Sequence, residues 1–293
     1  MPKTIKEEGF LNHVFIKNKR ILLITFIIQV LYLCVYKYCI PMPDFFSDSH
    51  SYVLAANRNL PLYYRPLGYS DFLSFLHVFS SSDLFVIVVQ YSLLSFSTIF
   101  LLFSIDYLYE FQNRKIKILA FILTALNPIF LVLANQIASD SLFSFYTILW
   151  FSSLLWILKE GKWWALILQV IILYLAFKVR YQALFFPAIS LIIFVLSSKS
   201  KLYYKIIGIF FSFVFISYAH KQEKKIVQKQ VQADVFAGFS GWMMANNALL
   251  IYKYTNTQTN DFEDPDLAQL DKIVKVTIDS FLLNKKMNLK NIH

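Results

Sequence analysis

Long apolar runs, separated by short polar segments, fill most of the first 220 residues of the chain. The runs are continuous and do not alternate with period two, so they predict helices that cross a bilayer and not the strands of a membrane barrel. By residue number, the predicted spans are 21–40, 84–108, 118–133, 142–158, 165–177, 183–196 and 206–218. We therefore expect an all-α polytopic membrane protein with a bundle of about seven transmembrane helices.

Basic residues between the predicted spans fall mainly on one side of the membrane. Thirteen of them lie on the side that includes the N-terminus, against five on the other side up to residue 220. The thirteen are Lys3, Lys6, Lys17, Lys19, Arg20, Arg114, Lys115, Lys117, Lys159, Lys162, Lys199, Lys201 and Lys205. The positive-inside rule then places residues 1–20 in the cytoplasm, makes the first span an uncleaved signal anchor and puts the loop 41–82 outside.

Residues 165–196 leave two arrangements open. This stretch is apolar apart from "KVRYQ", and cytoplasmic signals stand at both of its ends. Each half has only about 15 residues, fewer than the roughly 20 that usually cross a bilayer. The two halves form either two short membrane-crossing helices or a hairpin whose tip stays within the outer half of the membrane.

The chain changes character after residue 220. Residues 1–20, 21–220 and 221–293 are predicted as a cytoplasmic N-terminus, a transmembrane module and an extracytoplasmic C-terminal segment, which could be truncated. Within the last segment, Asp264 followed by Pro265 is a typical start of a helix, as N-cap and first helical residue.

The composition agrees with a membrane protein. Hydrophobic residues make up 57% of the chain and charged residues 16%, whereas about 25% of a soluble domain is charged. The net charge of +10 is explained by residues that flank the spans, so it does not indicate nucleic-acid binding. Cys34 and Cys39 are five positions apart on one predicted helix, which favours neither a disulfide nor a metal pair.

The polar stretch "SDSHSYVLAANRNLPLYYRPLGYSDF", residues 47–72, stands out between the apolar runs. The carboxylates expected on the outer side before residue 221 are Asp44, Asp48, Asp71, Asp83 and Asp140. Asp71 and Asp83 stand where helices begin, so capping explains them, and Asp44 fits either a structural or a functional role. Asp48 and Asp140 are the leading candidates for chemistry.

Asp48 and Tyr52 are one helical turn apart, on the same predicted face. Asp140 lies at the outer mouth of a span, where a carboxylate is costly to bury and marks a candidate functional site. Helix capping remains the structural alternative for both carboxylates.

Three cations accompany these carboxylates. Arg65 lies in a loop restricted by proline and glycine, while Lys178 and Arg180 interrupt the apolar stretch 165–196. They either extend to the membrane interface or bind a phosphate at the outer surface, for which the planar fork of arginine is suited. His50 and His77 have no partners at ligand spacing, so no metal site is predicted.

Four segments resemble the C-type (GT-C) membrane glycosyltransferases, which include protein mannosyltransferases and aminoarabinose transferases of lipid A. They are "SDSHSYVLAA", "YRPLGYSDFLSFL", "LNPIFLVLANQIASDSLFSFYTIL" and "AFKVRYQALFFPAI". The first is similar to a D-x-x-x-Y motif and the second to R-P-P-G-Y-P. The third has a proline followed by an acidic residue that opens a span, and the fourth has an arginine before an apolar run ending in proline.

The resemblance implies a GT-C-like bundle in the cell membrane that transfers a hexosyl or pentosyl group. The donor would be a polyprenyl-phosphate sugar, and the acceptor a glycan, lipid or protein outside the cytoplasm. It implies Asp48 and Asp140 as catalytic residues, with Asp48 as the base of an inverting reaction. The residues implied to bind substrate are Tyr52, Arg65, Tyr69, Lys178 and Arg180. No cofactor is expected, although a divalent metal remains open.

Two alternatives remain at this stage. A transporter or flippase of lipid-linked glycans would place broken helices and charges near the middle of the bilayer. An inactive, truncated member of the same superfamily would retain the fold without the reaction.

Overall fold

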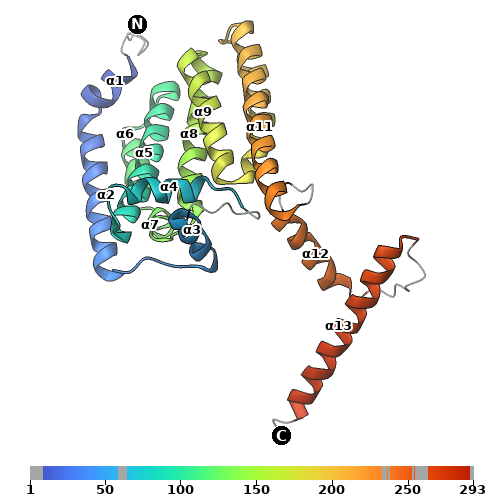
Figure 1. The fold of residues 1–293 in the computed structure, drawn as a ribbon. Helices are drawn as coiled ribbons and strands as arrows, with labels where there is room; N and C mark the ends of the chain where they lie inside the picture. Colours follow the sequence, from blue (N-terminus) through green and yellow to red (C-terminus); the bar gives the residue numbers. More distant parts are fainter. Residues whose placement is uncertain are drawn as a thin grey trace. The chain divides into compact units, whose positions relative to one another are not determined.

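The computed structural model describes residues 9–58, 65–232, 236, 238–252, 254 and 263–290 (Figure 1). The chain divides into two compact units, Met1–Phe236 and Ala237–His293. In unit 1 the elements are α1 (Phe10–Asn12), the π-helix η2 (His13–Lys17), α2 (Lys19–Cys39), α3 (Ser47–Arg58), α4 (Gly68–His77), α5 (Asp83–Tyr109), α6 (Arg114–Ala125), α7 (Pro128–Asn135), α8 (Ser139–Glu160), α9 (Trp163–Val179), the 3-10 helix η3 (Tyr181–Phe185), α10 (Phe186–Leu196) and α11 (Leu202–Val231). Unit 2 contains α12 (Gly238–Tyr252) and α13 (Pro265–Lys290).

The prediction of an all-α membrane protein is confirmed. Five segments are long and apolar enough to cross a membrane: Lys19–Cys39, Asp83–Tyr109, Arg114–Asn135, Ser139–Glu160 and Leu202–Lys229. Trp163–Val179 and Tyr181–Leu196 are apolar but shorter. Among the described residues, β-structure is limited to one isolated bridge between Asp44 and Gln136.

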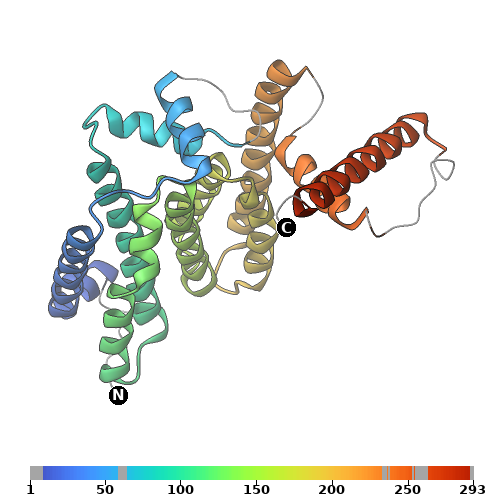
Figure 2. The same cartoon turned by 90° about the horizontal axis from the view of Figure 1, so that it is seen from below.

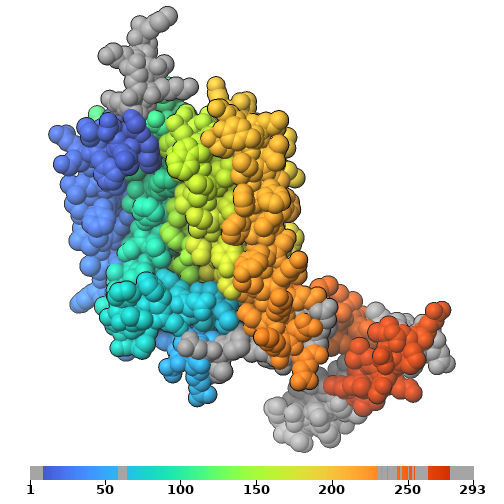
Figure 3. All heavy atoms as spheres, turned by 45° about the horizontal axis from the view of Figure 1, so that its top comes forward, coloured from blue at the N-terminus to red at the C-terminus, as the bar shows by residue number. Residues whose placement is uncertain are grey.

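The long helices of unit 1 lie side by side, and the short helices α3 and α4 lie across one end of the bundle, which we call the α3/α4 end (Figures 1 and 2). The opposite end carries the N-terminal segment and is called the N-terminal end. Figure 3 shows the long helices of unit 1 packed against one another along their length.

The predicted span 118–133 contains a break between α6 and α7. Asn127 caps α7 by accepting a hydrogen bond from the Ile129 backbone N–H at 3.0 Å, and Pro128 occupies the first helical position. Proline lacks a backbone N–H and is favoured at that position, so this dipeptide starts a new helix. The apolar run was visible in the sequence, but it folds as two helices in succession.

The hairpin formed by α9, η3 and α10 extends along the whole of α8. At one end, a Cβ on Gly161, after α8, would lie 2.8 Å from the backbone of Lys199, which follows α10. At the other end, the Arg180 side chain after α9 reaches Ser139 and Asp140, the first two residues of α8. The tip of the hairpin therefore lies level with the start of α8, at the α3/α4 end.

Buried polar side chains join the long helices. The Trp156 indole on α8 donates to Ser104 on α5 at 2.9 Å, and the Gln169 amide on α9 donates to Ser212 on α11 at 2.8 Å. In a bilayer the hydrophobic effect does not drive helix association, so such bonds and close packing hold neighbouring helices together.

The N-terminal end gathers basic residues around one buried carboxylate. Asp106 of α5 accepts a hydrogen bond from Lys117 of α6, and its Oδ2 lies 2.7 Å from His13 Nε2. Lys117 also donates to Asn18 at 2.7 Å. These bonds attach the segment before α2 to the ends of α5 and α6.

The end of α11 differs from the sequence prediction, whereas the start of α13 agrees with it. The helix that contains the predicted span 206–218 continues to Val231, so the polar segment after residue 220 begins as an extension of α11. In unit 2, the Asp264 carboxylate accepts a hydrogen bond from the Asp266 backbone N–H at 2.9 Å, directly before α13. This confirms the predicted helix start at Asp264 and Pro265.

We predict that Asp106→Leu destabilises unit 1 strongly. The substitution leaves the mostly buried Lys117 ammonium without its counter-ion, and breaking a buried pair typically costs about 3–5 kcal/mol. The free energy of unfolding, measured by titration with a denaturing detergent, should fall by that order. Lys115→Ala, at an exposed lysine on the same helix, should change it by no more than about 0.5 kcal/mol. Equal stability of the two variants would contradict the role of Asp106.

Candidate functional site

Asp48, at the start of α3, forms an ion pair and does not cap the helix. The Ser49 hydroxyl accepts a hydrogen bond from the Phe46 backbone N–H at 2.9 Å, while Asp48 Oδ1 lies 2.8 Å from Arg65 Nη2. The Asp48 side chain is 54% exposed and that of Arg65 only 13%. Asp48 is therefore held by a largely buried cation and still has surface open to a ligand.

Arg65 also lies over an aromatic ring. Its guanidinium carbon is 4.9 Å from the centroid of Tyr52, within the range of a cation–π contact. Burial alone would lower the pKa of the Arg65 guanidinium, but the hydrogen bond to Asp48 and the nearby Tyr52 raise it. Arg65 thus stays charged at every physiological pH.

Tyr52 connects this pair to the start of α8. Its hydroxyl lies 3.0 Å from the Ser139 hydroxyl, and its ring packs edge-on against Tyr69 with centroids 4.9 Å apart. Tyr69 is fully buried and donates a hydrogen bond to Gln90 at 3.0 Å, and burial raises the pKa of its phenol. In this conformation Tyr69 positions Tyr52 and has no surface with which to touch a substrate.

Arg180 closes the arrangement from the tip of the hairpin. Its Nη1 and Nη2 lie 2.7 and 3.3 Å from the two carboxylate oxygens of Asp140, and its Nε donates to the Ser139 hydroxyl at 3.1 Å. The position before α8 is occupied by Ala138, whose side chain cannot cap it, so Asp140 is used for this fork and not for a cap. The Arg180 and Asp140 side chains are 30% and 38% exposed.

These contacts make one chain of polar groups at the α3/α4 end, which we call the polar network. Its members are Asp48, Arg65, Tyr52, Ser139, Arg180 and Asp140. They come from α3, the residues before α4, the start of α8 and the residue after α9. An apolar cluster that includes Tyr52, Tyr69, Leu142 and Val179 packs beneath them.

Lys178 does not join the polar network. Its ammonium lies 2.5 Å from Glu223 Oε1 on α11, and the Glu223 side chain is almost completely buried. The two cations of "KVR" therefore have different partners. Whether either contacts a phosphate stays a prediction.

Asp44 and Asp71, two other carboxylates predicted to lie on the outer side, have a local partner or partial burial. Asp44 accepts a hydrogen bond from the Asn135 amide at 3.0 Å, and Asn135 in turn accepts one from Lys37 at 2.8 Å. Burial raises the pKa of the Asp71 carboxyl on α4, and Lys178 partly opposes the change.

Three residues of this region were missed by the sequence reasoning. Ser139 bridges Tyr52 and Arg180, Gln90 anchors Tyr69, and Glu223 pairs with Lys178. Gln90 was detectable in principle, because a polar side chain inside an apolar span requires a partner. Glu223 was overlooked because it follows the predicted end of the last span.

The arrangement suits anion recognition and proton transfer. Two arginines and two partly exposed carboxylates meet at one surface, and arginine forks bind phosphate oxygens well. In the part of the chain that the structure describes, no group of three or more His, Cys, Asp or Glu residues could hold a metal ion.

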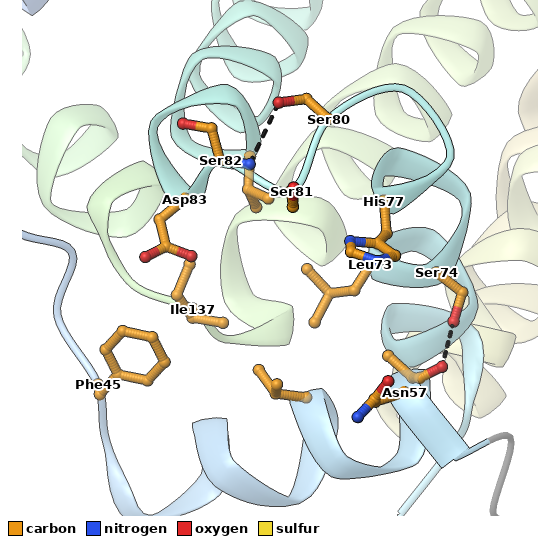
Figure 4. Close-up of a pocket in the computed structure, with 13 residues that line it drawn as sticks. Phe45, Asn57, Leu73, Ser74, His77, Ser80, Ser81, Ser82, Asp83 and Ile137 are labelled. Carbon is orange, nitrogen blue, oxygen red and sulfur yellow. Dashed lines mark hydrogen bonds between the residues drawn. The ribbon is translucent and has the colours of Figure 1, made fainter.

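A pocket of about 510 Å³ lies beside the polar network and is not lined by any of its members (Figure 4). Its walls come from the segment before α3, α3 itself, α4, the residues that lead into α5, and Ile137.

The fold and the polar network define the chain as an all-α membrane protein with two linked arginine–carboxylate pairs at the α3/α4 end. No family model, no curated protein and no solved structure matches the chain.

We predict that Gly68→Ala disturbs the polar network. A Cβ on Gly68, the first residue of α4, would lie 2.4 Å from the backbone oxygen of Lys178, so α4 must move away from the end of α9. Arg65 and Arg180 flank this junction. We expect a loss of about 1–3 kcal/mol in the free energy of unfolding, the usual cost of overpacking.

The matched control is Gly9→Ala, because a Cβ on Gly9 would meet nothing within 4 Å. Unchanged stability of Gly68→Ala, measured beside this control, would show that α4 and α9 are not packed as described.

Proposed function

We propose that the chain is an inverting glycosyltransferase that takes its sugar from a polyprenyl phosphate. One observation carries the proposal: each of the four segments that resemble GT-C enzymes contributes to the polar network or its direct support. The first segment supplies Asp48 and Tyr52, the second Arg65 and Tyr69, the third Asp140, and the fourth Arg180. The first two segments are neighbours in sequence, but the third and fourth are far from them, so sequence order alone would not bring all four together.

The proposed topology has seven crossings, with the α3/α4 end outside the cytoplasm. Contacts at the N-terminal end support it, because basic residues of several loops meet there. Lys117 contacts Asn18, Lys159 lies 4.3 Å from the Tyr109 ring centroid, and Gly161 lies against Lys199. A concentration of lysines at one end is typical of the cytoplasmic face.

In the proposed reaction, Asp48 takes the proton of an acceptor hydroxyl while the oxygen of that hydroxyl attacks C1 of the sugar. The bond between C1 and the phosphate oxygen breaks at the same time, and polyprenyl phosphate leaves with the electron pair. A single displacement of this kind inverts the configuration at C1. Positioned general bases of this kind contribute about 10²–10⁴-fold to rate.

Asp48 is assigned as base and Asp140 as the residue that orients Arg180. Both Asp140 oxygens accept hydrogen bonds from Arg180, whereas among the described residues only Oδ1 of Asp48 has a side-chain partner. Arg65 and Arg180 then stabilise the charge that develops on the leaving phosphate. For this, Arg180 must share its fork between Asp140 and the phosphate.

A transporter of lipid-linked glycans is the weaker candidate. Most ion pairs of the described part of unit 1 lie near helix ends, as at Asp106 on α5 and Asp140 on α8, and the exception is Glu223 within α11. A transporter is expected to place charged and unwound segments near the bilayer midplane.

We predict that Asp48→Asn lowers sugar transfer by about 10²-fold or more, because the amide keeps the shape and loses the base. Transfer is measured with the purified full chain in nanodiscs, polyprenyl-phosphate hexoses and pentoses carrying a radiolabel, and a cell-envelope acceptor extract. Asp44→Asn is the matched control and should keep most of the activity, since Asp44 is held by Asn135.

Full activity of Asp48→Asn would move the base to Asp140 or Asp44. Absence of transfer by the wild-type chain from every donor would contradict the proposed function itself.

A further inference from the structure

The pocket beside the polar network contains polar side chains that the fold does not use. His77 ends α4, Asp83 begins α5, and Asn57 lies near the end of α3. Among the described residues, none of these three side chains has a hydrogen-bond or ion-pair partner. Ser80, Ser81 and Ser82 add hydroxyl groups, and Figure 4 shows these residues around the pocket.

The sequence offered a purely structural role for Asp83, as a helix cap. In the structure Ser82 holds the N-cap position without a side-chain cap bond, and Asp83 is the first helical residue. A carboxylate in the first turn of a helix interacts favourably with the helix dipole. That role does not require Asp83 to face a pocket, so the carboxylate is available to a ligand.

The pocket also has apolar lining residues, two of which are held by the isolated bridge. Asp44 N–H donates to Asn135 O at 2.9 Å, and Ile137 N–H donates to Asp44 O at 3.1 Å. These bonds hold the backbone beside Phe45 and at Ile137, and both side chains line the pocket together with Val53 and Leu73. The pocket thus presents hydrogen-bonding groups together with an aromatic ring and aliphatic side chains.

This combination selects a class of ligand. Among the described residues no lysine or arginine lines the pocket, and Asp83 contributes a carboxylate, which disfavours phosphate and other anions. An acyl chain would leave the uncommitted polar groups without partners. A sugar ring presents hydroxyls at its rim and C–H groups on its faces, and a volume of about 510 Å³ accommodates it.

We propose that this pocket binds a sugar unit of the acceptor, which makes the acceptor a glycan or glycolipid. The assignment of this sugar to the acceptor rests on the proposed function, but the binding of a sugar to the pocket does not. The pocket and the polar network share a wall, because Leu73 and Ile137 line the pocket and also pack with Tyr52 in one apolar cluster.

The test is binding of simple glycosides to the full chain in nanodiscs, measured by saturation-transfer NMR. The probes are the methyl glycosides of glucose, galactose, mannose and N-acetylglucosamine. We expect at least one to bind the wild type. Val53→Trp, which fills the pocket from an exposed position, and Asp83→Asn should each weaken that binding about tenfold or more.

Val78→Trp is the matched control, since Val78 is 80% exposed and does not line the pocket. Binding should be retained in this variant and also in Asp48→Asn. Absence of binding by all four probes, equal binding to Val53→Trp, or loss of binding in Asp48→Asn would each overturn the proposal. Transfer is not measured here, so a failed transferase assay and a failed pocket assay give separate answers.

Discussion

The contact between Arg180 and the first two residues of α8 is the constraint on which the α3/α4 end depends. A cation in an apolar stretch requires a counter-charge, because burying an unpaired charge is costly. Asp140 supplies the charge and Ser139 a further acceptor. The same contact fixes the tip of the α9–α10 hairpin and orients Ser139 toward Tyr52. Tyr52 then contacts Arg65, and Arg65 contacts Asp48, which connects the remaining members of the polar network to this contact.

Most of the fold was predictable from the sequence, because apolar runs of this length have few other structures. What the pattern did not show were breaks and extensions within such runs. Pro128 starts a new helix inside one run, and the helix of the last run continues to Val231. The hairpin of residues 165–196 was ambiguous because its halves are short. The contact of Arg180 with the start of α8 sets the tip level with that end of α8, and the two crossings of the membrane stay a prediction.

The candidate site was predictable in its residues and not in its pairings. Elimination among a few outer carboxylates selected Asp48 and Asp140, and both take part in the network. The sequence analysis treated Lys178 and Arg180 as one pair of cations. In the structure Lys178 pairs with the buried Glu223 of α11, whereas Arg180 pairs with Asp140. Which arginine faces which carboxylate depends on packing between distant helices, as in the close approach of Gly68 to α9, and local patterns carry no such information.

The central claim is that four separate segments of the chain form one connected network. A double-mutant cycle across the contact between Tyr52 and Ser139 tests this claim most directly. Tyr52→Phe and Ser139→Ala each remove one hydroxyl from the contact that joins α3 to α8. The free energies of unfolding of the wild type, both single variants and the double variant give the coupling energy. The account predicts a coupling of at least about 0.5 kcal/mol, as for residues in one hydrogen-bond network. Strict additivity, within about 0.3 kcal/mol, would contradict it.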